Sequence, residues 1–256
     1  MKFNFPLKRL ASRALCIAAL TLATTSCSWL SNLDKDKTMD WSAQKLYKEA
    51  RAALDDSNWS DAKNYYTKLE ARYPFGTYAQ QAQVDLIYVY WKDGDAAQAV
   101  AEADRFLQSY PNNPNCDYVL YMKALSILNE QKGMFAFLSA EDASQRDAEA
   151  ARRAFETLKA LVVRYPESRF APEARRRMNE LVIAQAKHEL QTAQYYYKRH
   201  AYVAAIDRAQ RVVREFQNTP MRDDALLLIR DSYRALKLDG LEHDIQRIID
   251  LNKSKQ

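Results

Sequence analysis

The sequence predicts an all-α fold in which pairs of helices stack along one axis. Apolar residues recur at helical spacing, as Ala62, Tyr66 and Leu69 do at i, i+4 and i+7. A Tyr-Pro step ends this stretch, and the same step occurs at 73–74, 110–111 and 165–166. Proline disfavours the helical conformation at the residue before it, so each step marks a helix end. The chain has only four glycines and shows no strand-like alternation.

A similar apolar spacing precedes each of these steps, which indicates a repeated unit. The matching residues of the second, third and fourth copies are Ala99, Ala103 and Phe106; Ala154, Leu158 and Leu161; and Ala205, Ala209 and Val212. The fourth copy is degraded, with Gln217 in place of the proline, and a fifth runs from about Arg222 to Asn252. The unit resembles the tetratricopeptide repeat, a helix pair of about 34 residues. One pair cannot bury its own apolar face, so we expect a solenoid of about five helix pairs.

Residues 1–26 are predicted to be a bacterial lipoprotein signal peptide. Four basic residues precede a short apolar run that ends before Cys27. This run is too short to cross a membrane, which takes about 20 apolar residues. We therefore expect Cys27 to be the acylated first residue of the mature protein, although Thr24 stands where that pattern usually has leucine. The alternative is ordinary signal cleavage that leaves Cys27 unmodified.

The rest of the chain divides into a tether and a helical array. Residues 27–41 mix charged and apolar residues and are expected to link the lipid anchor to the first helix. Residues 42–168 are predicted to hold repeats one to three, with an interruption at 129–146. Residues 169–256 are predicted to hold a long connecting helix followed by repeats four and five.

Three residues are expected to cap the starts of helices. Asp95 and Thr77 are each followed three positions later by glutamine, which is the spacing of a capping box. Thr219 precedes a proline, and proline favours the first turn of a helix. The sequence therefore places helix starts just after Thr77, Asp95 and Thr219.

The charge balance of the mature chain argues against nucleic-acid binding. The full sequence has 38 basic and 33 acidic residues. The signal peptide takes away four basic residues and no acid, which leaves 34 basic against 33 acidic residues. Proteins that bind nucleic acids carry a basic footprint, so we expect no nucleic-acid partner.

The sequence carries no motif that indicates catalysis, a cofactor or a metal. His188, His200 and His243 are scattered, with no cysteine or histidine cluster at zinc spacing. No Walker loop, glycine-rich dinucleotide motif or nucleophile elbow occurs. Cys116 is the only cysteine outside the leader and Cys27, and we expect it to be a small buried hydrophobe. We therefore expect a protein that is not an enzyme and holds neither cofactor nor metal.

Three segments carry a more specific similarity. They are RYPFGTYAQQAQVDLIYVYW at 72–91, PNNPNCDYVLYMKALS at 111–126 and RDAEAARRAFETLKALVVRYPESRF at 146–170. These segments resemble the BamD (ComL) family, and the similarity runs from about residue 42 to the end of the chain. The resemblance implies a non-enzymatic lipoprotein with five repeats, held at the periplasmic face of the outer membrane. Its implied partners are the periplasmic domains of the barrel-forming BamA subunit, other Bam lipoproteins and unfolded outer-membrane β-barrel clients.

The resemblance also implies two binding sites. The first would receive clients or accessory subunits, at Tyr73, Pro74, Phe75, Gly76 and Tyr78. The second is Arg208, which aligns with a family arginine on the second helix of repeat four that pairs with an acidic residue of BamA. Gln217 departs from the repeat pattern nearby, and this puts the end of that helix in question.

Two alternatives from other classes stay open on the sequence alone. One is a general periplasmic repeat adaptor in cell-wall or cell-division coordination. The other is an envelope enzyme that uses helical repeats as a platform, because carboxylates far apart in sequence could still converge in space.

Overall fold

A computed structural model describes residues 36–129 and 140–253, and every regular element within these ranges is a helix. The helices are α2 (Ala43–Asp55), α3 (Trp59–Arg72), α4 (Thr77–Lys92), α5 (Ala96–Ser109), α6 (Cys116–Asn129), α7 (Ala140–Arg164), α8 (Ala171–Lys198), α9 (Tyr202–Glu215), α10 (Met221–Ala235) and α11 (Asp239–Lys253). The predicted all-α fold class is therefore confirmed.

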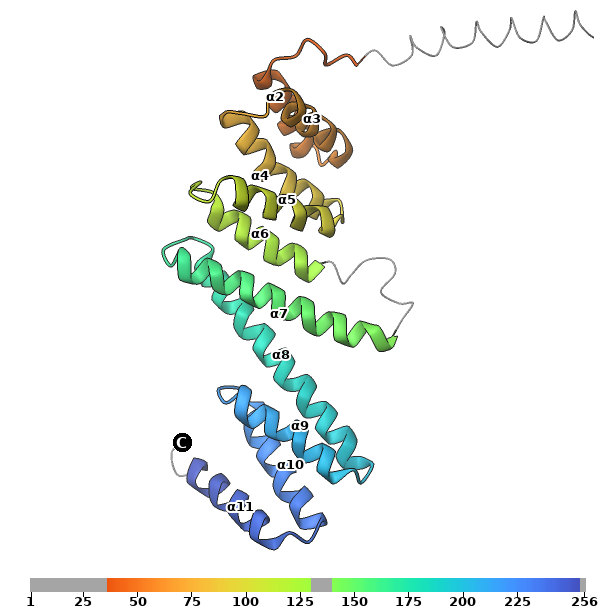
Figure 1. Cartoon of the computed structure of the whole chain (residues 1–256), viewed down its shortest axis with the longest axis vertical. Coiled ribbons are helices and arrows are strands. Elements are labelled where there is room, and N and C mark those ends of the chain that lie inside the picture. The colour runs from red at the N-terminus through yellow and green to blue at the C-terminus, as the bar shows by residue number, and fades with distance from the viewer. Residues whose placement is uncertain (1–35, 130–139, 254–256) are drawn as a thin grey trace, which may run out of the picture.

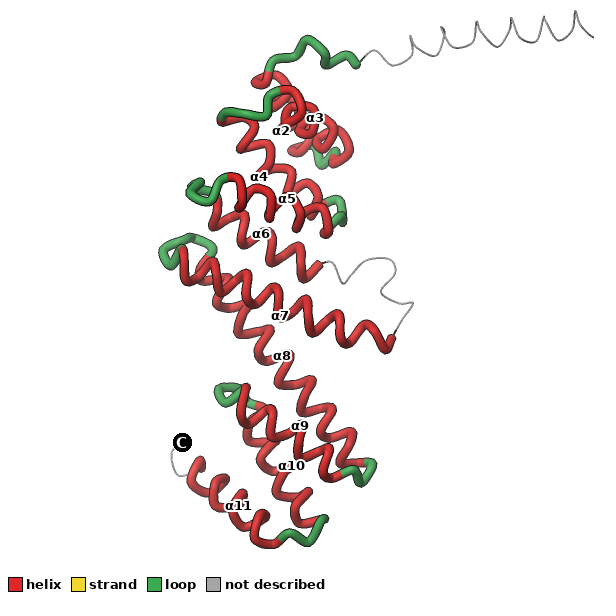
Figure 2. The backbone as a smooth tube through the Cα atoms, in the orientation of Figure 1, coloured by secondary structure: helices red, strands yellow, loops and turns green. Residues whose placement is uncertain are grey.

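The helices pair in sequence order, and the pairs stack into an elongated solenoid (Figure 1). Pair one is α2 with α3, pair two α4 with α5, pair three α6 with α7, pair four α8 with α9 and pair five α10 with α11. Each second helix also packs on the first helix of the next pair. The described turns within pairs lie along one edge, and the turns between pairs lie along the opposite edge (Figure 2). Contacts between sequence neighbours are typical of repeat solenoids.

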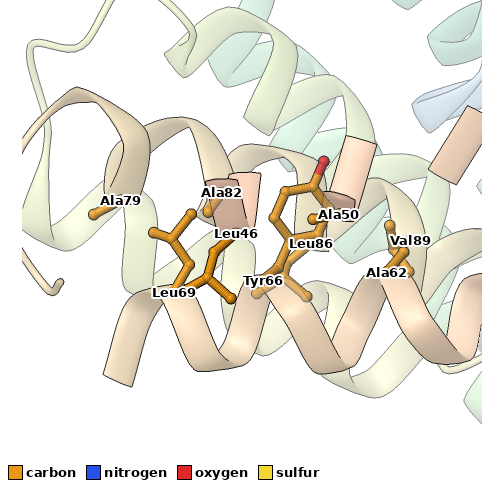
Figure 3. Packing of buried hydrophobic residues seen from close by; sticks show 9 residues of the cluster. All are labelled: Leu46, Ala50, Ala62, Tyr66, Leu69, Ala79, Ala82, Leu86 and Val89. Carbon is orange, nitrogen blue, oxygen red and sulfur yellow. The ribbon is translucent and has the colours of Figure 1, made fainter. Parts of the chain in front are cut away.

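Buried alanines and larger apolar side chains together fill the space between the packed helices. In the first cluster, Ala50, Ala62 and Ala82 are fully buried on α2, α3 and α4, beside Tyr66 and Leu69 (Figure 3). The apolar residues that the repeat spacing singles out are buried in all four copies. Burying one leucine-sized side chain contributes about 1.5–3 kcal/mol, so stability comes from many such contacts along the stack.

An aromatic residue ends each second helix of the first four pairs in the same way. The backbone N–H groups of Tyr73, Tyr110, Tyr165 and Phe216 each donate to the carbonyl four residues earlier, at 2.8–3.0 Å. Phe216 makes this bond although Gln217 follows it instead of proline. The end of α9 is therefore regular, and the aromatic residue rather than the proline is common to all four ends.

The four described turns within pairs also share one geometry. Ser57, Gly94, His200 and Lys237 each have a positive φ, between 58° and 85°. The residue after each of them donates its N–H to the carbonyl five positions back, at 2.8–3.0 Å. This is the left-handed ending that closes many helices, and glycine adopts it without steric cost. Only one of these four turns uses glycine.

One of the three predicted helix caps is confirmed and two are wrong. Asp95 accepts the N–H of Gln98 at 3.2 Å, as expected for a cap of α5. Thr77 is the first helical residue of α4, and the capping position is taken by Gly76, which has no side chain to accept a bond. Thr219 donates its hydroxyl back to the Phe216 carbonyl at 2.8 Å, and α10 begins only after Pro220.

The structure refines two of the predicted segments. Helix α7 begins at Ala140, so residues 140–146 of the predicted interruption are helical, while residues 130–139 lie outside the described residues. Helix α8 runs unbroken for 28 residues and contributes to two separate apolar clusters. Ala174, near its start, packs with α6 and α7, whereas Ala193, near its end, packs with α9 and α10.

Replacing Gly94 by alanine should destabilise the solenoid. A Cβ at this position would meet no atom within 4 Å, so the effect comes only from the backbone, whose φ is 85°. A left-handed alanine costs about 1–2 kcal/mol, and we expect the free energy of unfolding to fall by that amount.

Gly240→Ala is the matched control, because Gly240 also has open space around it but lies in helix α11. Alanine favours helix over glycine, so this variant should be unchanged or more stable by up to about 1 kcal/mol. Urea denaturation followed by circular dichroism measures both changes. Equal effects of the two substitutions would contradict the role given to the Gly94 backbone.

Candidate functional site

The turn between α3 and α4 carries an exposed aromatic group, which we call the aromatic turn and define as Tyr73, Pro74, Phe75, Gly76 and Tyr78. All five residues predicted for client binding are exposed, and 87% of the Phe75 surface is open to solvent. Soluble proteins bury most phenylalanines, so a side chain this exposed in a structured turn is a candidate contact for a partner.

Local contacts hold the aromatic turn in place. The Tyr73 hydroxyl donates to the Trp41 carbonyl at 2.9 Å, and the Tyr78 ring lies 5.4 Å from the Tyr47 ring. Gly76 has a φ of 100°, a conformation that residues with a side chain rarely adopt. The two tyrosines are thus anchored on α2 and the segment before it, while Phe75 extends into solvent.

The buried carboxylate of Asp85 helps to hold the same region in place. Asp85 on α4 is only 7% exposed and accepts the hydroxyls of Tyr66 and Tyr47 at 2.9 and 3.1 Å. Gln81 donates to Oδ1 of Asp85 at 3.1 Å. A guanidinium nitrogen of Arg51 lies 3.7 Å from Oδ2, the oxygen that accepts the tyrosine hydroxyls. Burial, together with the Asp85 charge, raises the pKa of Tyr66 and Tyr47, so both phenols stay protonated donors.

The Asp85 network joins the first three helices, because its members lie on α2, α3 and α4. A buried charge is costly unless it is paired and hydrogen-bonded, and this one is both. Sequence reasoning missed it. The available signal was a lone carboxylate inside the apolar run Val84–Ile87 of a predicted helix.

The end of the predicted tether is part of the folded structure. Asp36 pairs with Lys68 and Arg72 on α3, and its carboxylate also accepts the Thr38 backbone N–H at 3.0 Å. The hydrogen bond from Lys68, with those from Thr38, holds the pKa of the Asp36 carboxyl well below its usual range. Residues 36–41 therefore pack on pair one and do not act as a free linker.

The edge that carries the aromatic turn continues along the solenoid (Figure 2). Asn113 in the next turn donates to the Gln80 side chain at 3.0 Å, and Ser168 in the turn after that donates to Asp117 at 2.6 Å. Between these two later turns lies an open hollow of about 530 Å³, lined by Pro111, Asn112, Asn113, Pro114, Arg164 and Tyr165. The first three pairs thus present a continuous series of aromatic and polar turns.

Arg208 lies on α9, the second helix of pair four, so it is remote from the aromatic turn in the stacking order. Its Nη1 donates to Oε2 of Glu189 on α8 at 3.2 Å. Arg211 donates to the other oxygen of Glu189, also at 3.2 Å. The Glu189 side chain is 8% exposed, while those of Arg208 and Arg211 are 35% and 38% exposed.

The family resemblance singled out Arg208, whereas nothing in the sequence analysis pointed to Glu189 or Arg211. Glu189 is four residues before Ala193 and three after Ala186, so it shares the alanine face that packs on α9. A carboxylate on such a face was the signal that a buried pair would form. Cys27, the predicted lipidation site, lies outside the described residues.

Two features are absent from the described ranges 36–129 and 140–253. None of the helices between residues 36 and 253 combines the length and apolar character that a membrane span requires. The same part of the chain holds no group of histidine, cysteine, aspartate and glutamate side chains arranged to bind a metal ion.

Comparison with known proteins places the chain in one family. Residues 39–247 match the family model YfiO, described as outer membrane lipoprotein. The outer membrane protein assembly factor BamD of Neisseria meningitidis serogroup B is 38% identical over 245 residues, covering 95% of this chain and 92% of that protein. The protein of the same name from Vibrio cholerae is 35% identical over 217 residues, covering 85% of this chain and 90% of its own. The chain therefore belongs to the BamD (YfiO) family of outer membrane lipoproteins.

Proposed function

We propose that this chain is a lipid-anchored, non-enzymatic scaffold that helps to assemble β-barrel proteins into the outer membrane. Relatives that align with nearly the whole chain carry the name outer membrane protein assembly factor. Its partners in this proposal are the periplasmic domains of BamA, other Bam lipoproteins and unfolded outer-membrane clients. The observation that carries the proposal is an exposed phenylalanine between the two anchored tyrosines of the aromatic turn, in a chain from this family.

The aromatic turn suits an extended, aromatic-rich client segment. Phe75 and the exposed parts of Tyr73 and Tyr78 offer apolar area, and the two tyrosines also offer polar tips. The turns that follow along the same edge would let an unfolded chain continue across pairs two and three. Such contacts combine side-chain burial with backbone hydrogen bonds, as in other modes of peptide recognition.

Phe75→Asp combined with Tyr78→Ala should reduce client binding at least about tenfold, because truncated aromatic anchors commonly cost more than about 2 kcal/mol. The measurement is crosslinking of a C-terminal client peptide to the purified full chain. Val203→Asp, near the start of α9, is the control, since it also places a charge at an exposed apolar position but lies away from this edge. Crosslinking that survives the double substitution would show that clients bind elsewhere.

Arg208 is the proposed contact for an acidic residue of BamA. A guanidinium suits carboxylate recognition because it presents several donors in one plane. Arg208→Glu should release BamA in co-purification from detergent-solubilised envelopes, since it places a second acid beside Glu189 and repels the partner's carboxylate. Arg175→Glu, at an exposed position near the start of α8, is the charge-matched control. Equal recovery of BamA with both variants would refute the contact.

Cys27 is the proposed attachment site for the lipid anchor, with the outer membrane as destination. A single acyl chain gives only marginal membrane binding, so stable attachment requires the several chains of a mature lipoprotein. Cys27→Ala should leave the protein unprocessed or in the soluble fraction after cell lysis. If this variant, freed from its partners, still floats with membranes, the anchoring proposal fails.

A further inference from the structure

One buried carboxylate on α8 is shared by two guanidinium groups on α9. Glu189 accepts one hydrogen bond from Arg208 and one from Arg211, through a different oxygen in each case. The two arginines are three residues apart, so they lie on the same side of α9. Their like charges would push the side chains apart if no acid lay between them.

The three side chains together carry one unit of excess positive charge. Each guanidinium has five N–H donors, and only one nitrogen of each is engaged with Glu189. Both arginine side chains are about one-third exposed, whereas the carboxylate beneath them is almost fully covered. Donors are therefore left over on the solvent side, and a second carboxylate arriving there would complete the neutralisation.

We propose that Glu189 is a positioning residue that holds Arg208 and Arg211 side by side as a two-guanidinium clamp for one carboxylate of the protein partner. This inference rests on the proposed function and adds Arg211 to the binding surface. Holding both side chains in advance lowers the entropy lost on binding, which is the usual gain from preorganisation.

Helix packing alone does not account for the triad. An apolar cluster that includes Leu190, Ala193, Ile206 and Ala209 already joins α8 to α9. A buried ion pair adds little to stability beyond what apolar residues of similar volume would provide. The triad lies beside this cluster with its guanidinium groups partly in solvent. This position suits recognition of a partner better than it suits holding the two helices together.

Glu189→Gln separates positioning from simple charge attraction, because the two predict opposite signs. Neutralising Glu189 raises the local charge, so a patch that acts through charge alone would bind an acidic partner more tightly. If the clamp needs Glu189 to hold Arg208 and Arg211 in position, the Glu189→Gln variant should bind the acidic partner about tenfold more weakly. The measurement is the dissociation constant of the purified full chain for the periplasmic region of BamA. Equal or tighter binding overturns the positioning role.

Arg211→Gln tests the second guanidinium of the clamp and should weaken the affinity for the periplasmic region of BamA about tenfold. Arg175→Gln, which removes the same charge from an exposed position near the start of α8, should leave it unchanged. Arg211→Lys keeps the charge but loses the planar fork, so it should restore only part of the affinity. If Arg211→Gln and Arg175→Gln have equal effects, the two-guanidinium clamp is refuted.

Two further readouts keep the outcomes distinct. Client-peptide crosslinking near Phe75, together with the melting temperature, shows whether Glu189→Gln still folds. If it does not fold, the variants of Arg211, whose side chain is partly in solvent, test the clamp. If Arg208→Glu abolishes binding while Glu189→Gln and Arg211→Gln do not weaken it, only the clamp is overturned. If Arg208→Glu binds normally, the proposed BamA contact itself fails.

Discussion

The structure depends on the apolar face that each helix pair cannot bury alone. Alanines such as Ala62 and Ala209 let the backbones approach closely, and the next pair in the stack covers the larger side chains beside them. The core is therefore continuous along the solenoid and never gathers in one centre. The stacking of the pairs sets the position of every surface, including both candidate binding sites.

Two buried carboxylates interrupt this apolar core, one near each candidate surface. Asp85 ties α2, α3 and α4 together beneath the aromatic turn, and Glu189 lies between α8 and α9 beside the arginines. Apolar contacts have no direction, whereas a carboxylate that accepts several hydrogen bonds restricts the groups around it to a few arrangements. These acids thus give the two surfaces a more defined geometry than apolar packing alone would.

Much of the fold follows from local patterns. Apolar residues at i, i+4 and i+7 define buried helix faces, and all the positions selected in this way are buried. Helix starts are less secure, because a cap depends on one residue and its neighbours. Thr77 and Thr219 have capping side chains, yet Gly76 takes the capping position in one case and the Thr219 hydroxyl turns back in the other. The left-handed turns at Ser57, His200 and Lys237 have no glycine to signal them.

The sequence by itself determined the all-α class and the repeat. Both depend on residues close together in the chain, where spacing and composition are sufficient, whereas the roles expected for the aromatic turn and Arg208 came from the resemblance to a family. Only the tertiary structure decided that Asp36 folds back on α3, that Asp85 binds two tyrosines, and that Glu189 joins Arg208 to Arg211. Those contacts join different helices, and their geometry exists only once the stacked pairs bring the helices together.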